Sequence, residues 1–181
     1  MRVIDEALHG VKLLEPRIFR DPRGYFLESW NAMTFRACGI DASFVQDNHS
    51  GSVRGTLRGL HYQSLVQQGK LVRVLTGEIL DVAVDVRRAS PTFGQWRSWI
   101  LDAASHRMLW IPTGFAHGFV ARSEWAEVAY KCTAPYDAAS EVSIRWDDPA
   151  LAIDWQLGTG DVPRLSPKDA AGLSFADAPM L

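Results

Sequence analysis

The sequence contains very little cysteine. Only Cys38 and Cys132 occur among its 181 residues, and they stand far apart with no CxxC pair. This usage predicts a reducing compartment and two buried, unreactive thiols. It argues against a disulfide-stapled fold and against dithiol redox chemistry.

An excess of charge of one sign and long apolar runs are also missing. The chain has 19 Lys and Arg against 21 Asp and Glu, a formal net charge of −2, and no basic run. Nucleic-acid binding needs concentrated positive charge, so we expect no such partner. No stretch reaches the roughly eighteen consecutive apolar residues of a membrane span. Residues 1–16 carry charges and lack the apolar core of a signal peptide, so we expect no membrane partner and a cytoplasmic location.

What is present is the composition of an ordinary globular protein. Hydrophobic residues make up 47% of the chain and charged residues 22%. A chain of this length can bury enough apolar surface to fold without disulfides or structural metal. Because it has no internal repeat, low-complexity tract or Gly/Pro-rich linker, we expect residues 1–181 to form a single domain.

Short alternating segments dominate the chain. Within the segment Glu78 to Val86, one face carries Leu80, Val82, Val84 and Val86 and the other carries Asp81 and Asp85, which is the period of a half-buried strand. Similar strand-like runs cover 25–30, 44–50, 56–62, 70–75, 95–101, 106–111, 117–121 and 127–133. Helical signals are few: Asn31 to Cys38, ended by Gly39, and a turn near 167–171. Because sheet edges must be covered, so many short strands predict a mainly β fold, and a double-sheet jelly roll fits the pattern best.

Polar residues gather inside segments that are otherwise patterned as strands. The densest cluster comprises residues 46–50, Arg54, Arg58, His61, Gln63 and Lys70. Inward polar groups cost free energy unless they are paired, so the cluster indicates a wet pocket. Alternation groups His61 with Leu57, Gly59 and Gln63, and Lys70 with Val72 and Val74, which directs both toward a barrel interior. The alternative is a hydrogen-bonded core histidine and a lysine at a solvated strand end.

Two further side chains are predicted to face the interior. Tyr130 alternates with Val128 and Cys132, whereas Lys131 faces out. His117 follows a Pro-Thr-Gly turn and shares a face with Phe119. Simple packing roles for the tyrosine and the histidine are the alternatives.

The pattern does not favour a metal site. His61-Tyr-Gln63 holds one imidazole where a metal-binding cupin usually offers two within three residues, and no glutamate follows closely. We therefore expect no metal and no cofactor. A site assembled in space from His61, His117 and a carboxylate is the alternative.

Seven motifs in order along the chain resemble the dTDP-4-dehydrorhamnose 3,5-epimerase family. They are FVQDNHS (44–50), LRGLHYQ (57–63), KLVR (70–73), DVAVD (81–85), IPTGFAHGF (111–119), YK (130–131) and LSPKD (165–169). The resemblance runs from about Phe19 to Asp169. It implies a cupin-type jelly roll that forms homodimers and works without metal.

Residue roles follow from the same resemblance. It implies that His61 is the base, Tyr130 the acid, Lys70 the group facing the sugar ketone and Asp169 the carboxylate that orients His61. The positions that match the family's contacts to the nucleotide sugar are Arg23, Glu28, Gln46, Asp47, Asn48, Arg58, His117, Glu141 and Lys168, with Tyr136 where the family stacks an aromatic ring on thymine.

Elementary chemistry agrees with these roles. Inverting a carbon beside a C4 ketone needs a base on one face, a proton donor on the other and a positive group at the enolate. The implied activity is epimerisation of dTDP-4-dehydro-6-deoxyglucose at C3 and C5, toward dTDP-rhamnose-type sugars. The alternatives are a single-carbon epimerase, a 3,4-ketoisomerase and a non-catalytic cupin that only binds a sugar nucleotide.

Overall fold

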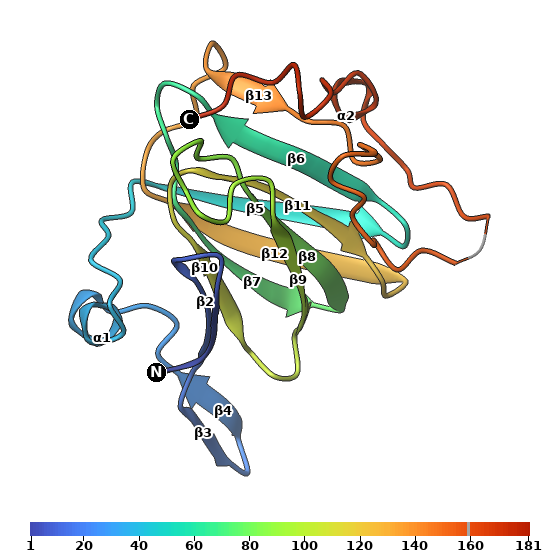
Figure 1. The fold of residues 1–181 in the computed structure, drawn as a ribbon. Helices are drawn as coiled ribbons and strands as arrows, with labels where there is room; N and C mark the ends of the chain where they lie inside the picture. The colour runs from blue at the N-terminus through green and yellow to red at the C-terminus, as the bar shows by residue number, and fades with distance from the viewer. Residues whose placement is uncertain (159) are drawn as a thin grey trace.

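Two facing antiparallel sheets form the body of the protein in the computed structural model, which describes residues 1–158 and 160–181 (Figure 1). One sheet has the order β1 (Arg2–Ala7), β2 (Val11–Glu15), β10 (Met108–Ile111), β7 (Lys70–Thr76), β12 (Trp125–Cys132), β5 (Gln46–Val53). The other has the order β13 (Glu141–Ser143), β6 (Leu57–Gln63), β11 (Phe115–Ala121), β8 (Glu78–Asp85), β9 (Trp96–Asp102). The predicted mainly β double-sheet fold is confirmed.

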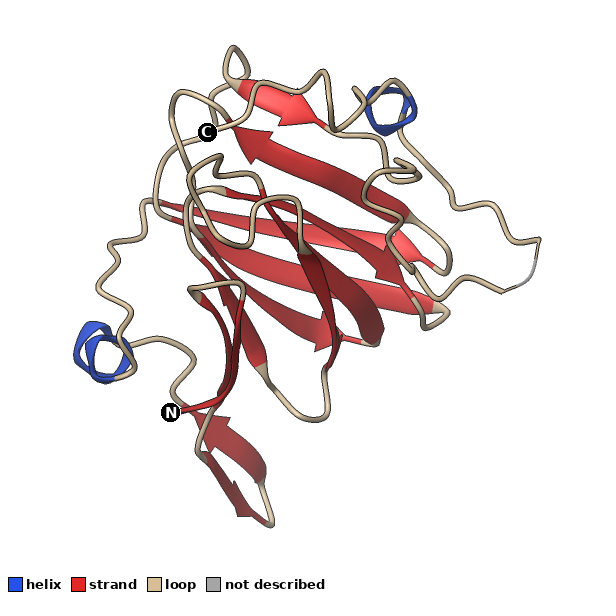
Figure 2. Cartoon of the chain, in the orientation of Figure 1, coloured by secondary structure: helices blue, strands red, loops and turns tan. Residues whose placement is uncertain are grey.

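Helix is scarce, as the sequence predicted (Figure 2). Helix α1 (Ala32–Ala37) starts after Asn31, whose side chain accepts hydrogen bonds from the backbone N–H groups of Met33 and Thr34. Helix α2 (Pro167–Ala170) follows the N-cap Ser166. The strand pair β3 (Ile18–Asp21) and β4 (Gly24–Leu27) projects from the body as a separate hairpin (Figure 1). No helix among residues 1–158 and 160–181 is long and apolar enough to cross a membrane.

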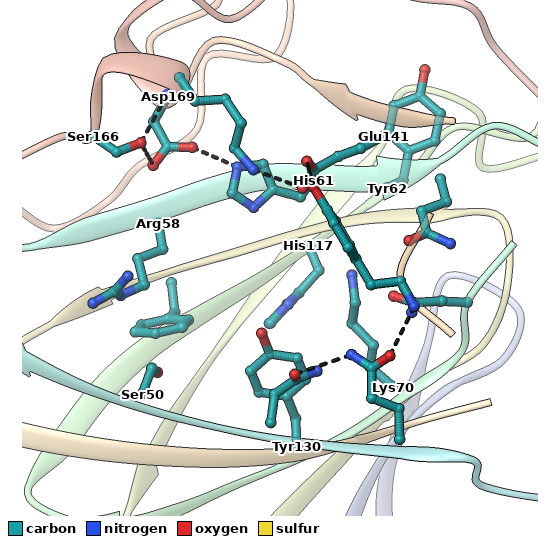
Figure 3. A pocket seen from close by; sticks show the side chains of 17 residues that line it. Ser50, Arg58, His61, Tyr62, Lys70, His117, Tyr130, Glu141, Ser166 and Asp169 are labelled. Atoms are coloured by element: carbon teal, nitrogen blue, oxygen red, sulfur yellow. Dashed lines mark hydrogen bonds and ion pairs between the residues drawn. The ribbon is translucent and has the colours of Figure 1, made fainter. Parts of the chain in front are cut away.

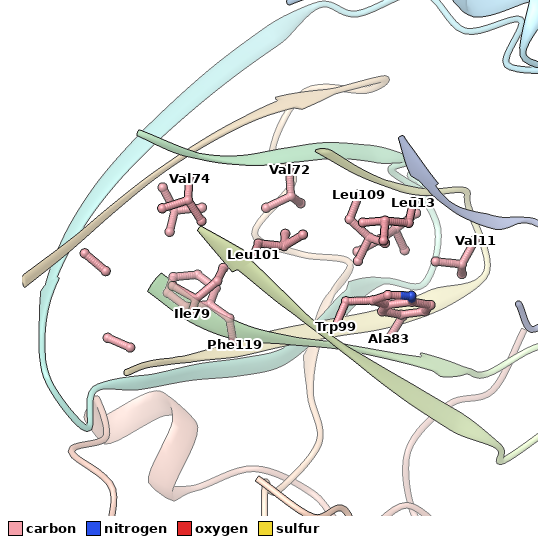
Figure 4. Packing of buried hydrophobic residues seen from close by; sticks show 14 of the residues in the cluster. Val11, Leu13, Val72, Val74, Ile79, Ala83, Trp99, Leu101, Leu109 and Phe119 are labelled. Atoms are coloured by element: carbon pink, nitrogen blue, oxygen red, sulfur yellow. The ribbon is translucent and has the colours of Figure 1, made fainter. Parts of the chain in front are cut away.

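The main hydrophobic core lies between the two sheets. Side chains of β7, β10 and β2 pack from one side against side chains of β8, β9 and β11 from the other (Figure 4). A second cluster covers the opposite face of the five-stranded sheet, where Leu80, Val82 and Val84 pack with Leu151 and Trp155. The five-stranded sheet is therefore buried on both faces.

This double burial corrects the prediction of a half-buried strand at Glu78 to Val86. Asp81 and Asp85 are fully buried, on the face of β8 that also carries Ile79 and Ala83 of the main core. Leu80, Val82 and Val84 point to the second cluster instead. Alternation identified the two faces, but it could not show that a later segment of the chain would cover the outer one.

A bulge in β6 corrects the predicted grouping of Leu57 with His61 on one face. In the pairing with β11, His61 lies opposite His117 and Arg58 opposite Phe119, so three steps along β6 match two along β11. The extra residue shifts the alternation by one position. Arg58 therefore shares the inward face with His61, whereas Leu57 packs in the second cluster on the other face.

The thiols are free, and only one of them is fully buried. Cys132 lies in the interior, but Cys38, next to the end of α1, is partly exposed. The prediction of two buried thiols is thus wrong for Cys38, because the short helix covers only part of it.

A buried carboxylate, Asp85, helps to connect the segment after β8 to the turn between β1 and β2. Asp85 accepts hydrogen bonds from the guanidinium of Arg87 at 2.7 and 2.8 Å and from the hydroxyls of Ser90 and Thr92 at 2.5 and 2.6 Å. Arg87 in turn donates to the backbone oxygen of Leu8 at 3.0 Å. Burial alone would raise the pKa of Asp85, but these hydrogen bonds outweigh it and lower that pKa to about 2.

We expect Asp85→Asn to lower the free energy of unfolding at pH 7. A carboxyl pKa depressed from 3.8 to about 2 corresponds to roughly 2 kcal/mol, present above pH 4 and lost as the pH falls toward 2. Urea unfolding of both proteins at pH 7 and pH 3 measures this. Asp41→Asn, at an exposed ion pair with Arg36, is the control and should change stability little. If the two proteins differed equally in their free energy of unfolding at pH 7 and at pH 3, the lowered pKa of Asp85 would be contradicted.

Candidate active site

A cavity of about 300 Å³ lies between the sheets. Strands β5, β6, β7, β11 and β12 line it, together with the segment around Tyr136 and the tail around α2 (Figure 3). Its lining residues are Gln46, Asn48, Ser50, Arg58, His61, Tyr62, Gln63, Gln68, Lys70, His117, Phe119, Tyr130, Tyr136, Glu141, Ser166, Lys168 and Asp169. Eleven of the fourteen predicted site residues are in this set.

A histidine, a carboxylate and a hydroxyl form a chain on one wall. His61 Nε2 lies 2.5 Å from Asp169 Oδ1, and the Ser166 hydroxyl donates to Asp169 Oδ2 at 2.7 Å (Figure 3). Asp169 is 3% exposed. Burial would raise its pKa, but the hydrogen bonds from His61 and Ser166 outweigh burial and lower it. Asp169 is therefore ionised at neutral pH and orients the imidazole, so the predicted contact between the tail and His61 is present.

Tyr130 stands on the other wall. It belongs to β12 of the six-stranded sheet, whereas His61 belongs to β6 of the five-stranded sheet (Figure 3). Burial raises the pKa of the Tyr130 hydroxyl, which keeps it protonated at neutral pH. An imidazole and a protonated phenol thus face one cavity from opposite sheets.

Lys70 reaches the same cavity. Its side chain extends there from the start of β7, beside Tyr130 and His117 (Figure 3). Burial lowers the pKa of Lys70, and the charges of Glu141 and Asp81 partly oppose that effect.

His117 is held by a carboxylate that sequence reasoning did not assign to the site. Its Nε2 lies 2.9 Å from both carboxylate oxygens of Asp81, which is fully buried. The available signal was the polar position of Asp81 within an apolar strand. Because a buried carboxylate must be paired, the same burial that hides Asp81 from solvent fixes the ring of His117.

The rim of the cavity carries a second polar chain. Glu141 accepts from Lys168 Nζ at 2.7 Å and from the Tyr136 hydroxyl at 2.8 Å. Burial would raise the pKa of Glu141, but these two hydrogen bonds lower it overall. The chain joins the β12–β13 connection to the tail across the opening.

Strand β5 divides its polar residues between two faces. Gln46, Asn48 and Ser50 line the cavity. Asp47 faces outward, where its carboxylate pairs with Lys131 Nζ at 3.0 Å. The run that looked like one polar cluster is a strand with an inner and an outer polar row.

Arg23 and Glu28 also lie outside the cavity of their own chain. Arg23 sits at the tip of the projecting hairpin and pairs with Asp21 at 2.7 Å. Glu28 accepts hydrogen bonds from Asn31 and from the Thr34 hydroxyl at the start of α1. The structure thus does not bring these two residues or Asp47 together with the other eleven.

The pocket includes further residues that sequence reasoning did not select, among them Gln68, Phe119 and Ser166. Ser166 had a signal, because a serine three residues before an acidic residue and directly before proline is a typical helix N-cap. Within residues 1–158 and 160–181, no three His, Cys, Asp or Glu side chains gather in a way that could hold a metal ion.

Comparison with known proteins identifies the family. A model of dTDP-4-dehydrorhamnose 3,5-epimerase matches residues 5–177. A curated relative of that name from Pseudomonas aeruginosa is 56% identical over 179 residues, 98% of each chain. This chain belongs to the dTDP-4-dehydrorhamnose 3,5-epimerase family. The resemblance seen in the seven motifs is thereby confirmed.

Solved structures of this epimerase family share the fold. A dTDP-6-deoxy-D-glucose-3,5-epimerase from Legionella pneumophila, in complex with dTDP-4-keto-L-rhamnose, has a TM-score of 0.93 and 52% identity, covering 98% of this chain and 94% of its own. A 3′-monoepimerase from Streptomyces bikiniensis, in complex with dTDP-quinovose, has a TM-score of 0.85 and 35% identity, covering 92% and 84%. One fold therefore serves epimerases of one carbon and of two.

We expect Asp169→Asn to slow turnover by on the order of 10²-fold or more while leaving the fold and substrate binding intact. The amide removes the negative charge that supports the protonated imidazole and holds its tautomer. Steady-state kinetics and the thermal midpoint test this. Asp177→Asn, an exposed carboxylate of the same tail that bonds Ser174, should leave both unchanged. Full turnover in Asp169→Asn would exclude the dyad.

Proposed function

We propose that the chain epimerises dTDP-4-dehydro-6-deoxyglucose at C3 and C5, giving dTDP-4-dehydro-L-rhamnose, with His61, Tyr130, Lys70 and Asp169 as its catalytic residues. The observation that carries the proposal is the position of His61 and Tyr130 on opposite walls of one cavity. The names of the family's relatives support the substrate and the reaction.

The proposed steps follow from the geometry. The C4 ketone makes the protons on C3 and C5 acidic, and His61 removes one of them from its side of the sugar ring. Lys70 faces the oxygen on which the enolate charge develops. Tyr130 then donates a proton from the opposite side, which inverts the carbon. Asp169 and Ser166 keep the imidazole in place throughout.

Binding of the nucleotide part is assigned to polar groups near the opening. Arg58 and Lys168 carry positive charge suited to a diphosphate. Gln46, Asn48, His117 and Glu141 supply further hydrogen-bonding groups, and Tyr136, which is 55% exposed, offers a ring for stacking on thymine.

A one-carbon epimerase is the second candidate, since such an enzyme has this fold. The curated relatives named as 3,5-epimerases are 43–56% identical to this chain and solved structures of that name, such as the one from Sulfolobus tokodaii, 41% or more, whereas the 3′-monoepimerase is 35% identical. That difference favours the two-carbon reaction. The opposed acid and base argue against a ketoisomerase as the main activity and against a protein that only binds the nucleotide sugar.

The proposal includes a cytoplasmic homodimer. The hairpin of β3 and β4 exposes large apolar side chains, including Phe26 at 71% and Tyr25 at 58%, and β1 is an open sheet edge. Such surfaces favour pairing of two copies. Arg23 and Glu28, which do not reach their own cavity, lie on or next to this hairpin and would be available to the cavity of the partner.

We expect solvent deuterium to enter both C3 and C5 during turnover, and the two site variants to fail differently. His61→Ala should abolish exchange at both carbons, a loss of about 10²-fold or more. Tyr130→Phe should keep some exchange and lose inversion, because the enolate still forms. Mass spectrometry and NMR of the products measure both.

Deuterium at C3 alone would identify a one-carbon epimerase. Equal loss of exchange and inversion in Tyr130→Phe would contradict the assignment of the two walls. Exhaustive chelation should leave the activity unchanged, and its loss with recovery on adding a divalent ion would refute a metal-free reaction.

Light scattering at micromolar concentration should give the mass of a dimer. Phe26→Asp should shift it toward the monomer, because it places a charge on the exposed apolar hairpin. Leu65→Asp changes a 79% exposed leucine in the β6–β7 connection and is the control, with no expected effect. A monomeric wild type would refute the homodimer.

A further inference from the structure

The segment that carries Tyr136 is fastened to the barrel by glutamine side chains. The Gln63 carbonyl oxygen accepts from the Asp137 N–H at 2.9 Å, and its amide nitrogen donates to the Pro135 carbonyl at 3.3 Å. These are the two residues that flank Tyr136. The Tyr136 N–H itself donates to Gln46 Oε1 at 2.8 Å. The backbone around one exposed ring is thus held from β6 and from β5.

Gln63 also joins this segment to the neighbouring loop. Its amide nitrogen donates to the Val66 carbonyl at 2.5 Å, in the connection between β6 and β7. In the same connection Gln68 donates to the Ala134 carbonyl at 2.7 Å. Because Gln63 is only 5% exposed and uses both ends of its amide, no water needs to complete its bonding.

Gln63 lies on the same strand as the proposed base His61. Gln63 follows His61 by two residues in β6. One strand therefore positions both the proposed base and the segment that carries Tyr136. The Tyr136 ring is 55% exposed, so it buries little apolar surface that could order the segment. The segment therefore depends on these hydrogen bonds for its order. A ligand that binds an ordered ring loses less binding free energy than one that must first immobilise a mobile ring.

We propose that Gln63 is a positioning residue for nucleotide recognition, which acts by holding Tyr136 at the mouth of the cavity. This rests on the proposed function, in which the Tyr136 ring stacks on the thymine of a dTDP-sugar. Gln63 acts through the backbone on either side of Tyr136. It serves binding of the nucleotide, and the chemical step stays with His61 and Tyr130.

The test replaces the amide by an uncharged side chain of similar size. Gln63→Met removes all three hydrogen bonds, and Gln67→Met makes the same change at an exposed position of the same connection. We expect Gln63→Met to weaken dTDP binding in calorimetry about tenfold and to raise KM similarly, with kcat within about threefold of wild type. Gln67→Met should match wild type in all three quantities.

A double-mutant cycle separates positioning from general stability. If Gln63 acts through Tyr136, then Gln63→Met should have little further effect on dTDP binding in a Tyr136→Ala background. An equal tenfold loss in that background, or a Gln63→Met variant that binds dTDP as wild type does, would overturn the inference. Should Gln63→Met fail to fold, Gln68→Met, which loses the bond to Ala134, runs through the same cycle with the same outcomes. Wild type that does not bind dTDP would instead refute the proposed function.

Discussion

Burying polar groups between two apolar sheets imposes one requirement on the whole site: each group needs a partner. Asp81 and Asp169 are nearly inaccessible to solvent, and each is paired with an imidazole that faces the cavity. A buried carboxylate without such a partner would cost several kcal/mol. The pair with Asp81 of β8 thus fixes the ring of His117, and the pair with Asp169 of α2 fixes the ring of His61.

The double-sheet architecture also explains how one cavity acquires two different walls. His61 comes from β6 and Tyr130 from β12, strands of different sheets. A reaction that removes a proton from one side of a ring and returns it on the other needs that separation. Backbone hydrogen bonds hold β6 and β12 in their sheets. The separation of His61 from Tyr130 therefore does not depend on flexible loops.

The less regular parts of the chain complete the site from outside the sheets. The tail brings Asp169 and Ser166 to His61, and the β12–β13 connection brings Tyr136 to Glu141 at the start of β13. Both are held by side-chain bonds to the barrel or to each other, such as Lys168 to Glu141 at 2.7 Å. The opening of the cavity is therefore lined by connections that side-chain hydrogen bonds hold in place.

Sequence alone determined the fold class, because alternation in segments such as 70–75 and 127–133 follows directly from backbone geometry. It also determined most of the cavity, since alternation and the family motifs both place Lys70, Tyr130 and His117 inward. Tertiary structure decided what depends on contacts distant in the chain. The C-terminal segment covered Leu80, Val82 and Val84 of β8, whereas Asp81 and Asp85 were buried on the opposite face, toward the main core. The bulge in β6 turned Arg58 inward, and Arg23 and Glu28 fell outside their own cavity. Local patterns report which residues share a face, but only the packing of remote segments sets what that face meets.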